Sequence, residues 1–132
     1  MRQPNTAATV YHTALYLRLS RDDKSPGESG SIQTQRMMLQ HYAVEHGLTV
    51  MDEYVDDGWS GTNFERPGFQ RLIEDIEDGK INCVVTKDLS RLGRNHILVG
   101  QYTDLYFPHK GVRFIAIKEG IDSIKGRSKV AP

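Results

Sequence analysis

The stretch Tyr16-Leu17-Arg18-Leu19-Ser20 decides the fold class of this 132-residue chain. Leucine at every second position predicts a β-strand over residues 13–19, with the leucines on one face and Tyr16, Arg18 and Ser20 on the other. A hydroxyl at the end of a strand, two residues from a guanidinium, is a candidate nucleophile. The plain alternative is a serine that only forms loop hydrogen bonds.

A second segment, Ser90-Arg91-Leu92-Gly93-Arg94-Asn95, carries two more arginines. If this segment is helical, Arg91 and Arg94 lie at i and i+3 on one face. Guanidinium groups bind phosphate oxygens through paired hydrogen bonds, so a serine ringed by arginines favours phosphoryl transfer through a covalent serine intermediate. The alternative for this segment is a solvated basic surface.

Arg18 is unusual because a mid-strand arginine is costly to bury without an anionic partner. The structural explanation is an ion pair with Asp56 or Asp57, and the functional explanation is a bound phosphate. Gln35 shares the core-facing stripe of the next predicted helix. It is either a satisfied amide at the edge of that stripe or a group that orients the serine loop or a phosphate.

The rest of the chain alternates predicted helices with predicted strands. Ser31 is a good N-cap, Gly47 and Gly79 end helices, and Pro67 suits a first helical turn. The expected elements are strand 13–19, loop 21–30, helix 31–46, strand 48–55, loop 56–66, helix 67–78, strand 81–86, helix 96–107 and strand 112–117, followed by residues 118–132 with no clear element. This order indicates an α/β fold in three layers, with a mostly parallel sheet flanked by helices.

Polar segments follow three of the predicted strands. They are Ser20, residues 56–66, which contain Ser60 and Arg66, and residues 87–94. Open α/β sheets place their sites beyond the carboxyl ends of the strands, so we expect these segments to meet at one edge of the sheet. The expected core consists of Leu15, Leu17, Leu39, Phe69, Leu72, Ile76, Val84, Leu105 and Ile115.

Composition excludes several classes of protein. With 17 Lys and Arg against 17 Asp and Glu, the chain has no formal net charge, which argues against a self-sufficient nucleic-acid binder. The single cysteine, Cys83, lies in an apolar run, and we expect it to be buried and inert. Residues 1–12 lack a secretory core and are expected to be a disordered tail, and the chain is expected to be cytoplasmic. Its histidines show no metal-ligand spacing and no nucleotide P-loop occurs, so we expect no metal and no cofactor.

Together these segments resemble the catalytic domain of the serine recombinases, the resolvase/invertase family, and most closely the large serine recombinases and transposases of mobile elements. The resemblance covers roughly residues 13–125. It rests on four motifs in the same order and spacing: Tyr16-Leu17-Arg18-Leu19-Ser20, Ser31-Ile32-Gln33-Thr34-Gln35, Asp57-Gly58-Trp59-Ser60-Gly61 with Arg66-Pro67-Gly68-Phe69, and Lys87-Asp88-Leu89-Ser90-Arg91-Leu92-Gly93-Arg94-Asn95.

The resemblance implies a sheet of about four to five strands with one antiparallel edge strand. It implies that Ser20 attacks a DNA phosphodiester and forms a 5′-phosphoserine link, leaving a 3′-hydroxyl that later rejoins the ends without metal or cofactor. By motif position, the implied phosphate ligands are Arg18, Arg66, Arg91 and Arg94, and the implied supporting residues are Gln35, Ser60 and Tyr16. Small family members often carry Asp where this chain has Ser90, and Asp88 is two positions away, so no general base for Ser20 is assigned.

The resemblance also sets expectations about domains and partners. The chain ends without completing an element, and we expect a catalytic domain over residues 13–132 that stops before the long dimerisation helix and the DNA-binding domains. The implied partners are DNA, bound mainly through those absent domains, and further copies in a homodimer or homotetramer. No membrane partner is implied. The fragment alone is expected to bind DNA poorly and to be inactive.

Two other functions fit the same pattern. One is a catalytically inert oligomerisation or regulatory module with the same fold, and the other is a phosphotransferase that acts on a small phosphate ester. Ser20 with four arginines speaks against the inert module, which has no need of them. The loop 21–30 lacks a tight phosphate-cradling pattern, which speaks against the phosphotransferase.

Overall fold

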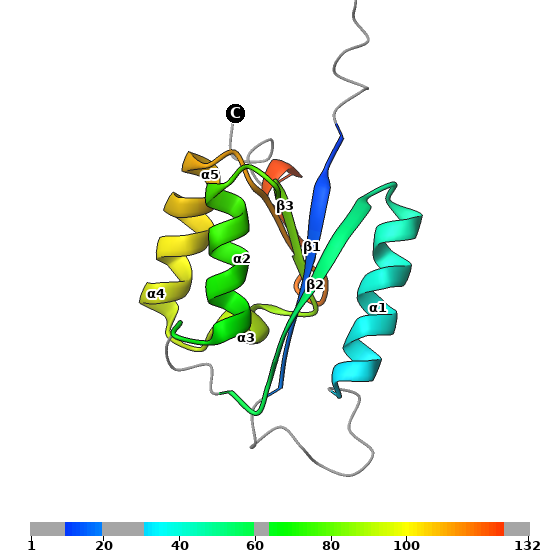
Figure 1. Ribbon diagram of the computed structural model, residues 1–132, viewed down its shortest axis with the longest axis horizontal. Helices are drawn as coiled ribbons and strands as arrows, with labels where there is room; N and C mark the ends of the chain where they lie inside the picture. The colour runs from blue at the N-terminus through cyan, green and yellow to red at the C-terminus, as the bar shows by residue number, and fades with distance from the viewer. Residues whose placement is uncertain (1–9, 20–30, 60–63, 126–132) are drawn as a thin grey trace, which may run out of the picture.

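A computed structural model describes residues 10–19, 31–59 and 64–125 of the chain. In Figure 1 the described part is a central sheet with helices on both faces. The predicted N-terminal tail up to residue 9, the loop 21–30, residues 126–132 and the two candidate serines Ser20 and Ser60 lie outside the described residues.

The sheet has five strands in the order β2-β1-β3-β4-β5. The strands are β1 (His12–Leu19), β2 (Thr49–Asp57), β3 (Cys83–Thr86), β4 (Arg113–Ala116) and β5 (Ile121–Asp122). Strands β1 to β4 are parallel, and β5 runs antiparallel to β4. The predicted α/β class and the antiparallel edge strand are confirmed, but the expectation of no element after residue 117 is wrong, because β5 lies there.

The helices cover the two faces of the sheet unequally. They are α1 (Ile32–Glu45), α2 (Pro67–Glu77), α3 (Leu89–Leu92), α4 (His96–Gly100), the π-helical η3 (Gln101–Tyr106) and α5 (Phe107–His109). In Figure 1, α1 lies on one side of the sheet, and α2 and α4 lie on the other. Ser31 caps α1 as predicted, because its hydroxyl accepts from the backbone amide of Thr34 at 3.0 Å.

The alternation along β1 feeds two separate hydrophobic cores. Leu15 and Leu17 pack with Leu39 of α1, whereas Tyr16 belongs to the core built with Phe69 and Leu72 of α2. All predicted core residues except Leu105 are buried, and so is Cys83. Burial raises the pKa of the Cys83 thiol to about 11, which keeps it a neutral thiol at physiological pH.

Leu105 is the error in the predicted core, because its side chain is 66% exposed. The helix over residues 96–109 is α-helical only at its two ends, and the π-helical segment between them changes which side chains face the sheet. Tyr102 and Tyr106 pack against the core in place of Leu105, and Phe107 behind them is buried. The helix ends at His109, between Pro108 and Gly111, the two residues near which the sequence predicts its stop.

One boundary difference bears on the site. Strand β2 continues through Asp57, two residues beyond its predicted end at Val55. Asp56 is therefore a buried strand residue rather than part of a polar loop. Among the described residues, no helix is long and apolar enough to cross a membrane.

Candidate active site

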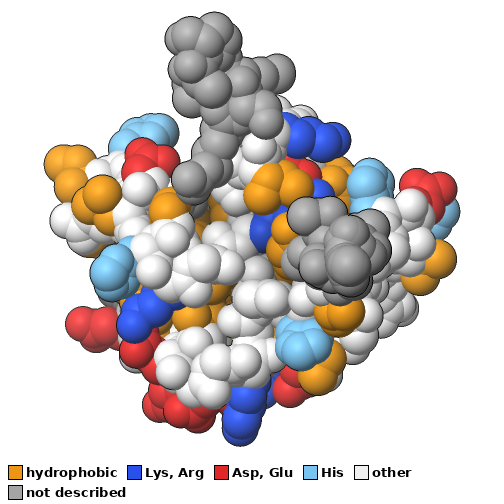
Figure 2. Space-filling view, turned by 90° about the horizontal axis from the view of Figure 1, so that it is seen from above, with side chains coloured by type: hydrophobic (Ala, Val, Ile, Leu, Met, Phe, Trp, Pro, Cys, Tyr) orange, Lys and Arg blue, Asp and Glu red, His pale blue; other side chains and the backbone are white. Residues whose placement is uncertain are grey.

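The carboxyl ends of the parallel strands β1, β2 and β3 lie together at the lower end of the molecule in Figure 1. The segments that carry Arg18, Arg66 and Arg91 meet there. Figure 2 shows the opposite end, where basic side chains in the coloured part of the surface are interspersed with acidic, histidine and hydrophobic ones. The segments that carry Arg18, Arg66 and Arg91 lie together at the carboxyl ends of the strands, as expected, whereas Ser20 and residues 60–63 lie outside the described residues.

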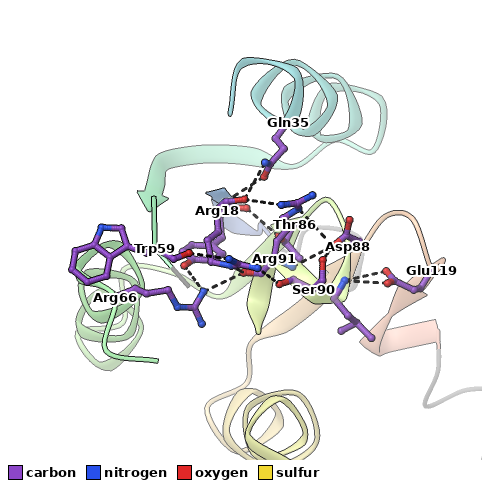
Figure 3. Close-up of polar contacts among 11 residues, drawn as sticks. Arg18, Gln35, Trp59, Arg66, Thr86, Asp88, Ser90, Arg91 and Glu119 are labelled. Carbon is purple, nitrogen blue, oxygen red and sulfur yellow. Dashed lines mark hydrogen bonds and ion pairs between the residues drawn. The ribbon is translucent and has the colours of Figure 1, made fainter. Parts of the chain in front are cut away.

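Arg18 is fully buried, and its guanidinium donates to three backbone carbonyls (Figure 3). Its Nε donates to the carbonyl of Arg91 at 3.0 Å. Its terminal nitrogens donate to the carbonyl of Trp59 at 2.9 Å and to that of Ser90 at 2.5 Å. One guanidinium thus ties the end of β1 to the segment after β2 and to α3.

The contacts of Arg18 correct one structural expectation. Its hydrogen bonds go to carbonyl groups and not to Asp56 or Asp57. Burial, and after it the charge of Arg66, lowers the pKa of Arg18 to about 10, so the group is a cation at neutral pH. The three backbone carbonyls supply the hydrogen bonds that a buried cation needs.

Arg66 is the second fully buried guanidinium, and it also contacts α3. It donates to the hydroxyl of Tyr16 at 2.8 Å, to the carbonyl of Arg91 at 3.2 Å and to the carbonyl of Leu92 at 2.5 Å. The last carbonyls of a helix lack intrahelical partners, and here arginine side chains supply the missing donors. The ring of Phe64 lies 4.8 Å from the Arg66 guanidinium carbon.

Arg91 joins this cluster, but the predicted arrangement of Arg91 and Arg94 on one helix face is wrong. Helix α3 ends at Leu92, and the extended Gly93 separates it from α4, so Arg94 is exposed outside the helix. A Cβ at Gly93 would lie 2.7 Å from an atom of the Phe64 ring, so close packing explains this glycine. The Arg91 side chain donates to the carbonyl of Arg18 at 3.1 Å.

The side chain of Gln35 forms hydrogen bonds with β1 beyond the point where the pairing of β1 with β3 ends. The last paired residue of β3 is Thr86, opposite Tyr16. Two residues further along β1, the Gln35 side chain accepts from the amide of Arg18 at 3.3 Å and donates to its carbonyl at 3.0 Å. The buried amide of Gln35 is therefore satisfied by the backbone of Arg18, as its structural alternative expects, and the predicted orienting role stays a prediction.

Tyr16 and Asp56 connect the arginine cluster to helix α2. The Tyr16 hydroxyl donates to Asp56 at 2.7 Å and accepts from Arg66, so both roles of the oxygen are filled. Burial raises the pKa of Tyr16 far above its usual range, which keeps the phenol protonated. Sequence reasoning considered Asp56 only as a partner of Arg18.

Asp88 is a second residue whose role sequence reasoning missed. Its carboxylate caps α3 by accepting from the amide of Arg91 at 3.2 Å, and it also accepts from the hydroxyl of Ser90 at 2.5 Å. The Nε of Arg91 lies 3.7 Å from the same carboxylate oxygen. Aspartate is a preferred N-cap residue, so the capping signal at the start of α3 was present in the sequence.

The chain belongs to the resolvase family of serine recombinases. It matches the family described as "Resolvase, N terminal domain" over residues 13–130. It is 33% identical over 81 residues to a protein of Bacillus subtilis (strain 168) named "Putative DNA recombinase", a match that covers 61% of this chain and 15% of that protein. This chain therefore corresponds to a small part of that relative.

Solved structures with the same architecture include two recombinase domains. The N-terminal catalytic domain of TP901-1 integrase is 33% identical, with a TM-score of 0.79 over 90% of this chain and 86% of that one. A resolvase family site-specific recombinase from Streptococcus pneumoniae is 30% identical, with a TM-score of 0.74 over 92% of this chain and 81% of that one. The fold is thus that of a serine recombinase catalytic domain.

Proposed function

We propose that this chain is the catalytic domain of a site-specific DNA recombinase or transposase, which cleaves and rejoins DNA through a 5′-phosphoserine at Ser20. The observation that carries the proposal is the convergence of Arg18, Arg66 and Arg91. They come from three segments far apart in the chain and contact one another's backbone or α3 where β1 leads into Ser20. The names of the relatives, an integrase and a site-specific recombinase, point to the same reaction.

The proposed reaction is a displacement at phosphorus. The Ser20 oxygen forms a bond to phosphorus while the bond to the 3′-oxygen breaks, so the 5′-phosphate stays on serine and the DNA leaves with a 3′-hydroxyl. Negative charge accumulates on the non-bridging oxygens, and preorganised guanidinium donors stabilise it. The reverse attack by a 3′-hydroxyl rejoins the strand and frees the serine, so no external energy source is consumed.

The arginines would meet the phosphate in different ways. Arg94 is exposed, so it can approach DNA without rearrangement of the buried cluster. Arg18 and Arg66 already donate to the carbonyls of residues 90–92. For either arginine to bind the phosphate, a phosphate oxygen has to replace one of these carbonyls as the acceptor of its hydrogen bond. In this proposal Gln35, Tyr16 and Ser60 support the site, and DNA and further copies of the full-length protein are the partners.

The test uses the full-length protein that contains this domain, with DNA carrying the ends of its own genetic element. Ser20→Ala is expected to abolish the covalent protein–DNA adduct and to leave DNA binding nearly intact, because affinity lies mainly in other domains. Ser123→Ala is the matched control, since the Ser123 hydroxyl accepts from the amide of Phe114 on β4, away from the arginine cluster. An adduct that persists in Ser20→Ala, or a wild-type adduct mapped to another residue, would contradict the proposal.

A further inference from the structure

Asp56 occupies a position that links helix α2 to the arginine cluster. Its carboxylate is buried and accepts from the backbone amides of Gly68 at 2.7 Å and Phe69 at 2.9 Å, in the first turn of α2. The N-cap residue of α2, Arg66, makes no capping bond with its side chain. Asp56 therefore supplies from β2 the capping group that α2 lacks, and its negative charge suits the positive end of that helix.

Gly68 shows that the carboxylate is fitted closely to the helix. A Cβ at this position would lie 2.9 Å from both carboxylate oxygens of Asp56 and 2.9 Å from the backbone carbonyl of Val55. Because this carbonyl is part of the paired backbone of β2, it cannot move aside as a flexible side chain could. The absence of a side chain at Gly68 is what allows Asp56 to reach the amides of α2.

The same carboxylate also fixes Arg66 through Tyr16. Tyr16 donates to Asp56, so its hydroxyl oxygen must face Arg66 as an acceptor, and Arg66 donates to it at 2.8 Å. Arg66 also donates to the carbonyls of Arg91 and Leu92 at the end of α3. A continuous set of buried hydrogen bonds thus runs from the first turn of α2 to the segment that carries Arg91.

We infer that Asp56 is a positioning residue, which acts through Tyr16 to hold Arg66 and the end of α3 in the geometry that DNA cleavage requires. The inference rests on the proposed function, because it assigns a role within the same site. Asp56 itself touches no reacting group. Its effect on the reaction is indirect, through the direction in which the Tyr16 hydroxyl points and through the charge it places beside Arg66.

The experiment measures single-turnover formation of the covalent adduct, and DNA binding, in the full-length protein with Asp56→Asn and with Tyr16→Phe. A misplacement of about 1 Å in a reacting site can cost about 10²-fold in rate, and we expect each variant to slow adduct formation by about 10- to 100-fold with unchanged DNA affinity. The two changes interrupt one hydrogen-bonded path, so the double variant is expected to be about as slow as the slower single variant.

Tyr54→Phe and Asp75→Asn are the matched controls. The Tyr54 hydroxyl on β2 donates to Asp75 of α2 at 2.5 Å, so these controls remove the same two kinds of group near α2 from a pair whose described contacts do not include Arg66 or α3. These controls are expected to lower stability without slowing adduct formation by more than about twofold. If they slow it as much as Asp56→Asn does, the effect is one of general stability and the inference is wrong.

The outcomes separate this inference from the proposed function. If the wild type forms no adduct at Ser20, the proposed function fails. If the wild type forms the adduct and both Asp56→Asn and Tyr16→Phe match its rate, the positioning role fails and the function stands. Should Asp56→Asn not fold, Tyr16→Phe still decides the matter, because it leaves the Asp56 carboxylate bound to the amides of α2 and removes only the bridging hydroxyl.

Discussion

Two tyrosine–aspartate pairs join the sheet to α2, and their surroundings differ. Tyr16 and Asp56 are both buried, and the arginine beside them, Arg66, is also buried. At the second pair, Tyr54 is buried but Asp75 is only partly so. The arginine over the Tyr54 ring, at 4.1 Å, is the exposed Arg71.

The difference shows that the same kinds of side chain contribute differently to stability when they are buried and when they are exposed. Arg71 donates to the exposed carboxylate of Asp52 at 2.9 Å, a surface pair of a kind that contributes little to stability. Arg66 is fully buried, so water cannot take the place of a hydrogen-bond partner that is removed. Removing a partner therefore leaves a buried polar group without its hydrogen bond. We therefore expect changes at the buried pair to be felt in both folding and cleavage, and changes at the other pair in folding alone.

The largest expected effect tests whether the buried arginines take part in the chemistry. Arg18→Lys keeps the positive charge but loses the planar set of donors that spans three carbonyls, so adduct formation in the full-length protein should slow by about 10²–10³-fold. The rate of covalent adduct formation is the measurement, with circular dichroism to show that the fold survives. Arg71→Lys is the control on the exposed side, and equal rates for Arg18→Lys and wild type would remove Arg18 from the chemistry.

The next effect concerns stability. Arg66→Ala removes a buried cation and strands the groups it contacts, and we expect a loss of about 3–5 kcal/mol in the free energy of unfolding. Arg71→Ala should cost no more than about 1 kcal/mol. Urea unfolding of this chain measures both, and similar losses for the two arginines would contradict the contrast drawn from burial.

A loss of stability with a lower minimum is expected for the apolar side of α2. Leu72→Ala should cost about 2–5 kcal/mol, because Leu72 is fully buried in the core that contains Tyr16. Leu105→Ala should change the free energy of unfolding by less than about 0.5 kcal/mol, since that side chain is exposed. A thermal midpoint unchanged in Leu72→Ala would show that the buried face of α2 is wrongly placed.

The smallest effects are expected in the alkaline pH dependence of stability. Burial raises the pKa of Tyr16 and of Tyr54, so the unfolded chain loses these protons first as the pH rises. The free energy of unfolding should therefore fall above about pH 10, the usual phenol value. Tyr16→Phe and Tyr54→Phe should each make the fall less steep. Cys83→Ala is needed as a reference, because the Cys83 thiol, with a pKa of about 11, contributes to the same fall.

The sequence predicts the framework of the site better than its contacts. Leucine alternation places β1 correctly, and the glycine and proline signals locate α1 and α2 within a few residues. Backbone carbonyls, which hold Arg18, carry no sequence signature, so their part in the cluster could not be predicted. The break of the helix at Gly93 depends on the close packing of Phe64, a contact between residues 29 positions apart that no local pattern records.

The same limit explains the error at Leu105. A spacing argument assumes a single helical period, and the π-helical segment changes the period within one continuous helix. Strand β5 was missed because it has only two residues, Ile121 and Asp122, too few for an alternating pattern. Its place is set by pairing with β4 and by the ion pair of Arg113 with Asp122 at 2.7 Å.

The side chain of Gln35 makes the end of β1 depend on α1 in a way that hydrogen exchange can detect. The amide proton of Arg18 is covered by a side chain from a helix and not by a neighbouring strand. Its exchange with solvent deuterium should follow the local opening of α1, whereas the amides of β1 that pair with β3 should follow the opening of the sheet. The exchange rate of the Arg18 amide, two positions before Ser20, therefore measures how often α1 leaves its place on the sheet.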